Sequence, residues 1–266
     1  MTSWDLAALV AIFLFGVPHG GFDAAIARRS GWLMNGRLSW VAFHLAYVAI
    51  AAAVAVIWWY FPVISLSLFL LISGYHFGAS DIADTGSHWL PWVAHGGLVP
   101  IVIPSLNPEA VKPIFSILIG TSEADLLLSM IQIIFILWLL ICVCYCVFIY
   151  YKKQYSRPLM ALLAMVAIAL VLPPLMCFSV YFCLWHSRGH IARLWHSLQQ
   201  NQRLATVQEA IVYTLLSWIS AVLFFFYLSG PISDIILQIT FIGLAALTWP
   251  HMILVDYMDK HRGHYE

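Results

Sequence analysis

Two histidines four residues apart mark the stretch of this 266-residue chain whose residue types are best suited to chemistry. They are His186 and His190, in the sequence WHSRGHIARLW. Residues at positions i and i+4 lie on the same face of a helix, one above the other. Two imidazoles at that spacing can bind one metal ion, because neutral histidine is the commonest metal ligand in proteins. The spacing therefore predicts a metal site on this segment.

Three other apolar segments each carry one histidine near the same end, namely His19, His76 and His251. Ionisable side chains inside membrane segments are costly and are usually functional. We predict that His19 and His76 join His186 and His190 as metal ligands, and that His251 is a further ligand or contacts the ligands. Four imidazoles without a cysteine suit iron, copper or zinc. In an apolar site, iron that uses molecular oxygen is the natural candidate, because oxygen is nonpolar and dissolves in the bilayer.

Two aspartates follow the first two histidines closely. Asp23 lies four residues after His19, and Asp81 lies just beyond His76. A ligating histidine usually donates its other N–H to a carboxylate or a carbonyl group. Asp23 and Asp81 are therefore candidates to orient the ligands, although charges at the membrane interface would look the same. The remaining histidines have weaker cases, since most lie near segment ends or in the tail: His44, His88, His95, His196, His261 and His264.

The composition indicates the elements that must position these residues. Hydrophobic residues make up 63% of the chain and charged residues only 9%, whereas soluble domains carry about 25% charged residues. Apolar runs of a length that can cross a bilayer recur along the chain. We predict one all-α domain over residues 1–266, a polytopic membrane helix bundle of about eight to nine transmembrane helices in the cell (cytoplasmic) membrane. The net charge is zero, so nothing suggests a nucleic-acid partner.

The number of helices depends on Pro173–Pro174, which interrupts a long apolar run. If this pair forms a hairpin, there are nine helices, and every lysine and arginine except Lys112 falls on the cytoplasmic side, as membrane proteins prefer. The five histidines then share the cytoplasmic half of the bundle, so two considerations favour nine helices over eight. Residues 107–125 are expected to form a loop. The expected helices cover residues 4–29, 40–60, 62–84, 91–104, 126–151, 158–172, 175–198, 207–228 and 232–255.

Aromatic and small residues surround the histidines. The aromatic ones could line a channel for a long, flat, apolar substrate, or belong to an interfacial aromatic belt; they are Phe22, Tyr75, Phe77, Tyr181, Trp185 and Trp249. Small residues let membrane helices approach closely, although generic helix packing predicts the same glycines. These are Gly16, Gly20, Gly21, Gly74, Gly78 and Gly189.

Four motifs on these segments together resemble the bacteriorhodopsin-related-protein-like (Brp/Blh) family of membrane β-carotene dioxygenases. They are GVPHGGFD, GYHFGASD, WHSRGHI and WPHMILVDYMD, between residues 16 and 259. The resemblance implies cleavage of the central 15,15′ double bond of β-carotene by O2, giving two molecules of retinal for a microbial rhodopsin. It also implies Fe(2+) held by the family's histidines, which fall on His19, His76, His186 and His190. The fourth motif of the family contains a histidine that matches His251. No catalytic residue beyond the metal centre is expected.

Other functions are less consistent with these residues. A membrane di-iron desaturase or hydroxylase needs several clustered histidine pairs, and only one H-x-x-x-H pair occurs here. A haem b protein could use two of the histidines as ligands. A transporter could contain broken helices, but the near absence of other buried polar residues argues against it. A retinal-binding rhodopsin is excluded, because it needs a lysine within a helix and the four lysines lie at segment ends or in loops: Lys112, Lys152, Lys153 and Lys260.

Overall fold

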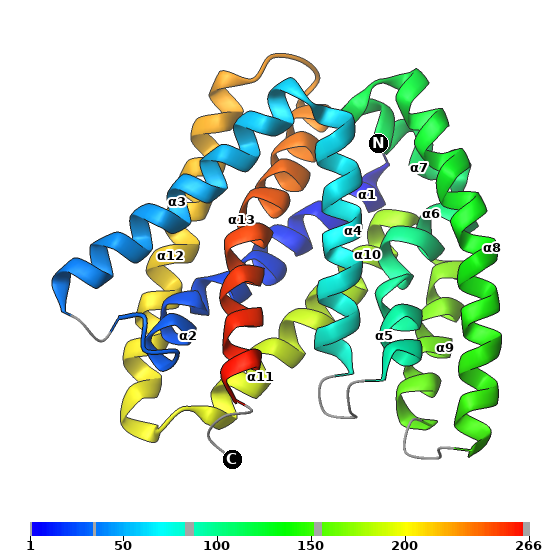
Figure 1. The fold of residues 1–266 in the computed structure, drawn as a ribbon. Coiled ribbons are helices and arrows are strands. Elements are labelled where there is room, and N and C mark those ends of the chain that lie inside the picture. The colour runs from blue at the N-terminus through cyan, green and yellow to red at the C-terminus, as the bar shows by residue number, and fades with distance from the viewer. Residues whose placement is uncertain (1, 34–35, 83–87, 152–155, 263–266) are drawn as a thin grey trace. The chain divides into compact units, whose positions relative to one another are not determined.

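The protein is all-helical in the part of the chain that its structure describes. The structure is a computed structural model that describes residues 2–33, 36–82, 88–151 and 156–262. Every regular element in these ranges is a helix, which confirms the all-α prediction (Figure 1). In chain order the elements are α1 (Ser3–Ala11), η1 (Ile12–Gly16), η2 (Val17–Phe22), α2 (Asp23–Arg29), α3 (Arg37–Tyr60), α4 (Pro62–Asp81), α5 (Trp89–Gly96), η3 (Leu98–Val102), α6 (Ile103–Leu106), α7 (Pro108–Ile119), α8 (Thr121–Tyr151), α9 (Ser156–Val171), α10 (Pro174–Val180), η5 (Tyr181–Ser187), α11 (Arg188–Ser197), α12 (Gln200–Tyr227) and α13 (Ile232–Arg262).

Six helical runs among the described residues are long and apolar enough to cross a membrane: Ser3–Arg29, α3, α4, α8, α12 and Ile232–Val255. The pair Trp89–Gly96 and Leu98–Leu106, bent by 42°, makes a seventh if it counts as one span, and Arg157–Val171 is a shorter apolar helix. The polytopic helical architecture is therefore confirmed. The predicted break at Pro173–Pro174 is also present, because α9 ends at Val171 and α10 begins at Pro174. The count of eight to nine crossings stays a prediction.

The loop expected over residues 107–125 is wrong, because most of it is helical. Pro108 lies in the first turn of α7, where proline is tolerated because the first N–H groups of a helix have no internal partner. The apolar side chains at i, i+3, i+4 and i+7 form one buried face: Val111, Ile114, Phe115 and Leu118. Gly120 ends the helix with a φ of 97°, a region that favours glycine. Across this turn Lys112 Nζ lies 2.8 Å from Asp125 Oδ1, and this hydrogen bond and charge raise the pKa of Lys112.

The chain divides into two compact units, each assembled from two separated stretches. Unit 1 comprises Met1–Leu9 and Pro62–His186, and unit 2 comprises Val10–Phe61 and Ser187–Glu266. Neither unit is a contiguous segment: α3 and the preceding α2 belong to unit 2, whereas unit 1 joins the N-terminal residues to the stretch that begins with α4. The single domain expected over residues 1–266 stays a prediction.

Close backbone contact joins α4 to α5 within unit 1. A Cβ atom at Gly78 would lie 2.4 Å from the carbonyl oxygen of Trp92, and one at Gly96 would lie 2.2 Å from that of Gly74. Only glycine permits such an approach. The prediction that glycines near His76 allow close packing is therefore confirmed for Gly74 and Gly78.

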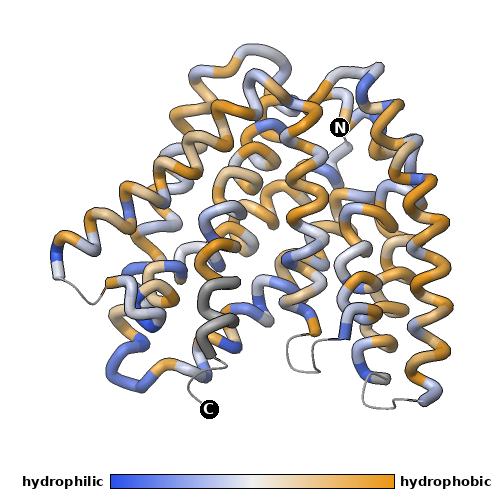
Figure 2. The backbone as a smooth tube through the Cα atoms, in the orientation of Figure 1, coloured by the Kyte–Doolittle hydropathy of each residue, from blue (hydrophilic) through white to orange (hydrophobic). Residues whose placement is uncertain are grey.

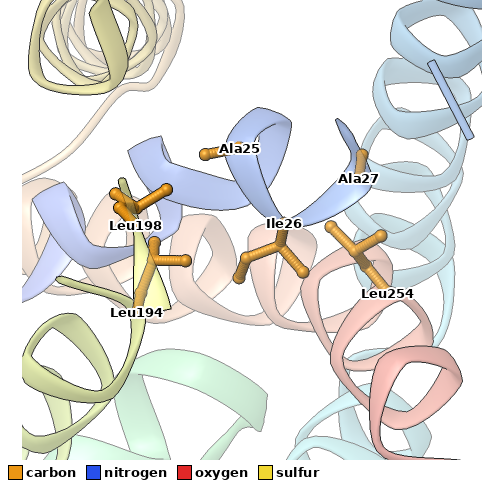
Figure 3. Packing of buried hydrophobic residues seen from close by; sticks show 6 residues of the cluster. All are labelled: Ala25, Ile26, Ala27, Leu194, Leu198 and Leu254. Atoms are coloured by element: carbon orange, nitrogen blue, oxygen red, sulfur yellow. The ribbon is translucent and has the colours of Figure 1, made fainter. Parts of the chain in front are cut away.

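Unit 2 packs η2 against α12 and α3 against α13. A Cβ atom at Gly21 would lie 2.6 Å from the carbonyl oxygen of Ala210, so this glycine is also required by packing. By contrast, Gly20 has no neighbour within 4 Å of such an atom. Figure 3 shows the side chain of Ile26 between those of Leu194 and Leu254. The full buried apolar cluster is Ala25, Ile26, Ala27, Leu194, Leu198 and Leu254.

The outer surfaces of several long helices are apolar, the reverse of what a soluble protein shows. Figure 2 shows α8 as mainly hydrophobic along its length. On this helix Ile133 and Val143 are 64% and 61% exposed, and large apolar side chains are also exposed on α3 and α12. Contiguous exposed apolar surface of this extent indicates contact with lipid.

Candidate metal centre

His19 lies in a segment whose backbone departs from α-helical geometry. The π-helix η1 leads directly into the 3₁₀-helix η2, which begins at Val17 with Pro18 in its first turn. The ring is buried, and its Nδ1 lies 2.5 Å from the carbonyl oxygen of Gly16. Because a carbonyl oxygen can only accept a hydrogen bond, Nδ1 carries the proton and Nε2 of the neutral ring carries the lone pair. Single-turn departures of this kind are frequent at functional sites.

A hydrogen-bonded group in unit 2 connects His251 to a carboxylate and a tyrosine. Nδ1 of His251, on α13, lies 2.7 Å from Oδ1 of Asp23. The other oxygen of Asp23, Oδ2, accepts a hydrogen bond of 2.7 Å from the hydroxyl of Tyr47 on α3. The His251 and Asp23 side chains are only 4% and 5% exposed. Since a carboxylate accepts the Nδ1 proton, Nε2 of neutral His251 also carries a lone pair.

Three imidazoles gather in unit 2. The ring centroids of His19 and His251 are 5.2 Å apart, those of His190 and His251 5.1 Å, and those of His19 and His190 5.8 Å. Two imidazoles bound through nitrogen to one metal at ordinary ligand distances have centroids roughly 5 Å apart. All three rings are buried. Unit 2 thus concentrates His19, His190 and His251 at nearly the spacing that shared coordination requires.

Unit 1 holds the other two predicted ligands. The ring centroids of His76, on α4, and His186, on η5, are 4.9 Å apart. Oδ1 of Asp81 lies 3.7 Å from Nδ1 of His186, and Oδ2 accepts a 2.6 Å hydrogen bond from the hydroxyl of Tyr181. The side chains of His186 and Asp81 are 0% and 4% exposed. A carboxylate and a tyrosine hydroxyl therefore accompany the histidines in both units.

The donor types fit a metal that prefers nitrogen ligands, but the positions of the donor atoms differ from those of a formed site. Among the described residues, no group of three or more histidine, cysteine, aspartate or glutamate side chains has the arrangement needed to hold a metal ion. The imidazoles are buried within each unit, and the partners of His19 and His251 select the tautomer whose lone pair is on Nε2. Assignment of His19, His76, His186 and His190 as ligands stays a prediction.

Aromatic rings surround the histidine pair of unit 1. The centroid of Phe77 lies 4.8 Å from that of His186, and Phe182 stacks on His186 at 5.9 Å with an interplanar angle of 10°. Phe77 also contacts Tyr181, with centroids 5.1 Å apart. Two of the six predicted lining residues, Phe77 and Tyr181, therefore lie beside a predicted ligand.

The other four predicted lining residues have different surroundings. Phe22 packs against the apolar cluster of unit 2. The ring of Tyr75 meets that of Trp92 edge to face and is 42% exposed. Trp185 is 39% exposed, and Trp249 is half-buried. The role of these residues in substrate binding stays a prediction.

Both aspartates have partners that differ from those suggested by their spacing. Asp23 follows His19 by one turn, yet its carboxylate binds His251, and Nδ1 of His19 meets a backbone carbonyl instead. Asp81 follows His76, yet it faces His186. The carboxylates therefore link separate helices, whereas the sequence suggested that they support the histidine on their own helix.

The sequence did not single out Tyr47, and it marked His95 only as a weaker candidate for a metal ligand. Tyr47 lies in a segment that is apolar apart from His44, and a tyrosine hydroxyl within such a segment needs a hydrogen-bond partner. This need for a partner could have identified Tyr47 from the sequence. His95, on α5, is 5% exposed, and its ring lies edge to face with Tyr145 at 6.5 Å. No spacing to another histidine marked it.

Known proteins resemble this chain along almost its whole length. A family model described as beta-carotene 15,15′-dioxygenase matches residues 10–259. A beta-carotene 15,15′-dioxygenase of the uncultured marine bacterium 66A03 is 35% identical over 263 residues, which cover 96% of this chain and 94% of the relative. A probable beta-carotene 15,15′-dioxygenase Blh of Halobacterium salinarum is 25% identical over 298 residues, covering 97% of this chain and 85% of the relative. No solved structure matches the chain. With its buried histidines on apolar helices and a family match over residues 10–259, the chain belongs to the β-carotene 15,15′-dioxygenase family.

Proposed function

We propose that this protein is a membrane dioxygenase that cleaves the central 15,15′ double bond of β-carotene with O2, giving two molecules of all-trans-retinal. The observation that carries the proposal is the 35% identity, over 96% of the chain, to a relative named for this reaction. The reaction balances without another reactant, because the carbon–carbon double bond breaks and each of its two carbons gains one oxygen atom. The exposed apolar surfaces of the helices suit a substrate that is dissolved in the bilayer.

The proposed cofactor is Fe(2+), with His19, His76, His186 and His190 as its ligands. Support comes from the chemistry of the donors, since neutral imidazoles without thiolates suit iron among other metals. It also comes from the gathering of His19 and His190 in unit 2 and of His76 and His186 in unit 1. Bound iron would supply the activation of O2, which organic side chains cannot provide. His251 is proposed as a further ligand or as a group that contacts the ligands.

The protein's own side chains have the tasks of orienting the ligands and excluding water. Asp23 keeps the Nδ1 proton on His251 and leaves Nε2 of that ring able to bind a metal. Oδ1 of Asp81 lies 3.7 Å from Nδ1 of His186, beyond hydrogen-bond distance, so it would act on that ring through its charge. Phe77 and Phe182 cover the His186 ring and shield it from polar solvent.

The aromatic residues are proposed to set the position of the polyene. Cleavage at the central bond requires that the middle of a long chain, rather than one end, meets the oxygen. Flat rings beside His186 can contact a conjugated chain over an extended length. Phe77 and Tyr181 are the best supported lining residues, because both rings lie near His186. The further lining residues proposed are Phe22, Tyr75, Trp185 and Trp249.

The proposed location is the cytoplasmic membrane, with several crossings of the lipid bilayer. Among the described residues, six helical runs of suitable length and apolarity support a membrane location. The retinal produced there would pass to a microbial rhodopsin, a protein that needs the same apolar compound in the same membrane.

The test is expression in bacteria engineered to make β-carotene, followed by chromatography of the extracted pigments. The wild type is compared with His186→Ala and with His196→Ala, whose histidine is exposed on the neighbouring helix α11. We expect retinal and loss of the orange colour with the wild type and His196→Ala, and unchanged carotene with His186→Ala. Shorter or longer apocarotenals would contradict central cleavage. Unchanged carotene in wild-type cells that contain the protein and iron would contradict the proposed function.

A further inference from the structure

In unit 2, the two carboxylate oxygens of Asp23 contact two partners from distant parts of the chain. Oδ2 accepts the Tyr47 hydroxyl at 2.7 Å, and Oδ1 lies 2.7 Å from Nδ1 of His251. The side chain of Asp23 is 5% exposed. An ionised carboxylate buried to this degree is costly unless hydrogen bonds compensate it. Two bonds on two different oxygens also fix the plane of the carboxylate, because rotation would break both.

The same three residue types recur in unit 1. The Tyr181 hydroxyl donates a hydrogen bond of 2.6 Å to Oδ2 of Asp81, and Oδ1 of Asp81 faces Nδ1 of His186 at 3.7 Å. The tyrosines occupy unrelated sequence positions, one on α3 and the other at the start of η5. A tyrosine-bound aspartate thus lies beside a buried histidine in both units, with a hydrogen bond to the histidine in unit 2 and a 3.7 Å approach in unit 1. This recurrence argues that the arrangement serves the histidines.

We propose that Tyr47 and Tyr181 are positioning residues for the metal centre. Each hydroxyl holds one carboxylate oxygen, so that the other oxygen is directed at Nδ1 of a histidine. At His251 the hydrogen bond from Nδ1 to Asp23 then fixes the ring orientation and the tautomer in which Nε2 is the metal-binding atom. At His186 the Asp81 oxygen lies 3.7 Å from Nδ1, beyond hydrogen-bond distance, and acts on the ring through its charge. This inference rests on the proposed function, because it requires that His251 and His186 lie at a metal centre.

A purely structural role is the competing explanation. Buried tyrosine hydroxyls usually find a partner, and these two could simply satisfy the aspartates. Unit 2 contains a suitable control, Tyr213 on α12, whose hydroxyl lies 2.7 Å from Nε2 of His44. Tyr213→Phe removes one tyrosine–histidine hydrogen bond of the same length in the same unit, and His44 is not among the proposed ligands.

The experiment measures metal binding by the purified full-length protein in lipid nanodiscs. Metal-free wild type, Tyr47→Phe, Tyr181→Phe and Tyr213→Phe are titrated with Co(2+), whose visible absorption reports the geometry of its ligands. We expect Tyr47→Phe and Tyr181→Phe to bind Co(2+) about 10- to 100-fold more weakly than the wild type, with altered visible bands. Tyr213→Phe should match the wild type in both affinity and spectrum. Thermal midpoints of all four proteins are measured in parallel.

The outcomes separate this inference from the proposed function. Wild-type affinity and bands in both Tyr47→Phe and Tyr181→Phe would overturn the positioning role while leaving carotene cleavage by the wild type untouched. An equal loss in Tyr213→Phe would overturn it too, because any buried tyrosine would then have the same effect. Absence of Co(2+) binding by a wild type that cleaves carotene would overturn it by removing the histidine metal centre. If Tyr47→Phe yields no folded protein, Tyr181→Phe applies the same test to the other unit.

Discussion

Among the single residues, the most informative feature is which nitrogen of each buried imidazole carries the proton. His19 and His251 both direct Nδ1 toward an oxygen acceptor, a backbone carbonyl in one case and a carboxylate in the other. In each neutral ring the lone pair is then on Nε2. Different local partners therefore produce the same donor atom. Since metal binding requires an unprotonated nitrogen, this shared tautomer prepares both rings for coordination.

Replacement of His251 tests its place at the metal centre. His251 lies about equally far from His19 and His190, with ring centroids 5.2 and 5.1 Å away. We expect His251→Ala to retain about 10-fold less iron than the wild type after purification, because either a ligand or the group that orients one is lost. Iron is measured by elemental analysis per mole of protein.

The control for this change is His196→Ala, which removes an exposed imidazole on α11. It should retain as much iron as the wild type. Equal iron in His251→Ala and the wild type would show that His251 contributes neither binding nor orientation.

Two of the predicted ligands lie on helical elements whose geometry is not that of an α-helix. His19 lies on η2, directly after the π-helix η1, and His186 lies on the π-helix η5. In a π-helix the hydrogen bonds span five residues, so side chains rotate away from the positions that a 3.6-residue repeat assigns. The faces of these helices therefore cannot be derived from an ideal α-helical repeat.

Glycines on α4 and α5 allow the backbones of these two helices to approach closely. Gly78→Ala would place a methyl group 2.4 Å from the carbonyl oxygen of Trp92, a backbone atom that cannot rotate away. We expect this change to destabilise the protein by about 1–3 kcal/mol, the usual cost of overpacking. The measurement is the thermal midpoint of unfolding in detergent, together with carotene cleavage in cells.

Gly243→Ala is the matched substitution, because Gly243 lies within α13 and has no atom within 4 Å of the added methyl group. It should leave the protein unchanged or stabilise it by about 0.5–1 kcal/mol, since alanine favours helices. Equal midpoints for the two variants would contradict the close contact between α4 and α5.

Membrane topology is the main question at the scale of the whole molecule. The nine-helix arrangement puts every lysine and arginine except Lys112 on the cytoplasmic side. The observed break before α10 is the feature that this arrangement requires. It predicts an external Pro173–Pro174 turn and a cytoplasmic C-terminus, whereas an eight-helix arrangement predicts an external C-terminus.

Reporter fusions in bacteria distinguish the two arrangements. We expect green fluorescent protein at the C-terminus to fluoresce, because it folds in the cytoplasm. Alkaline phosphatase should be active when fused after Leu172 and inactive when fused after Leu198, because the enzyme requires an external location. A dark C-terminal fusion, with alkaline phosphatase active at that same position, would contradict nine helices.

The helical class, the break at Pro173–Pro174 and the burial of five histidines follow from residue type and order alone. Long apolar runs predict helices because the backbone must satisfy its own hydrogen bonds in lipid, and Pro173–Pro174 interrupts one because proline lacks the N–H that a helix needs. His19, His76, His186, His190 and His251 were all expected to be buried, and all are. The helix over Pro108–Ile119 was missed, because its charges and prolines resemble those of a loop.

The groups that these histidines contact depend instead on how separate helices pack. Spacing placed Asp23 beside His19, yet its carboxylate binds His251, 228 residues away along the chain, and receives the Tyr47 hydroxyl from a third helix. Helical periodicity determines which residues share a face of one helix, but hydrogen bonds require atoms within about 3 Å of each other. Contact at that distance between separate helices depends on how they pack, and in unit 2 Gly21 sets part of that packing by admitting the backbone of α12.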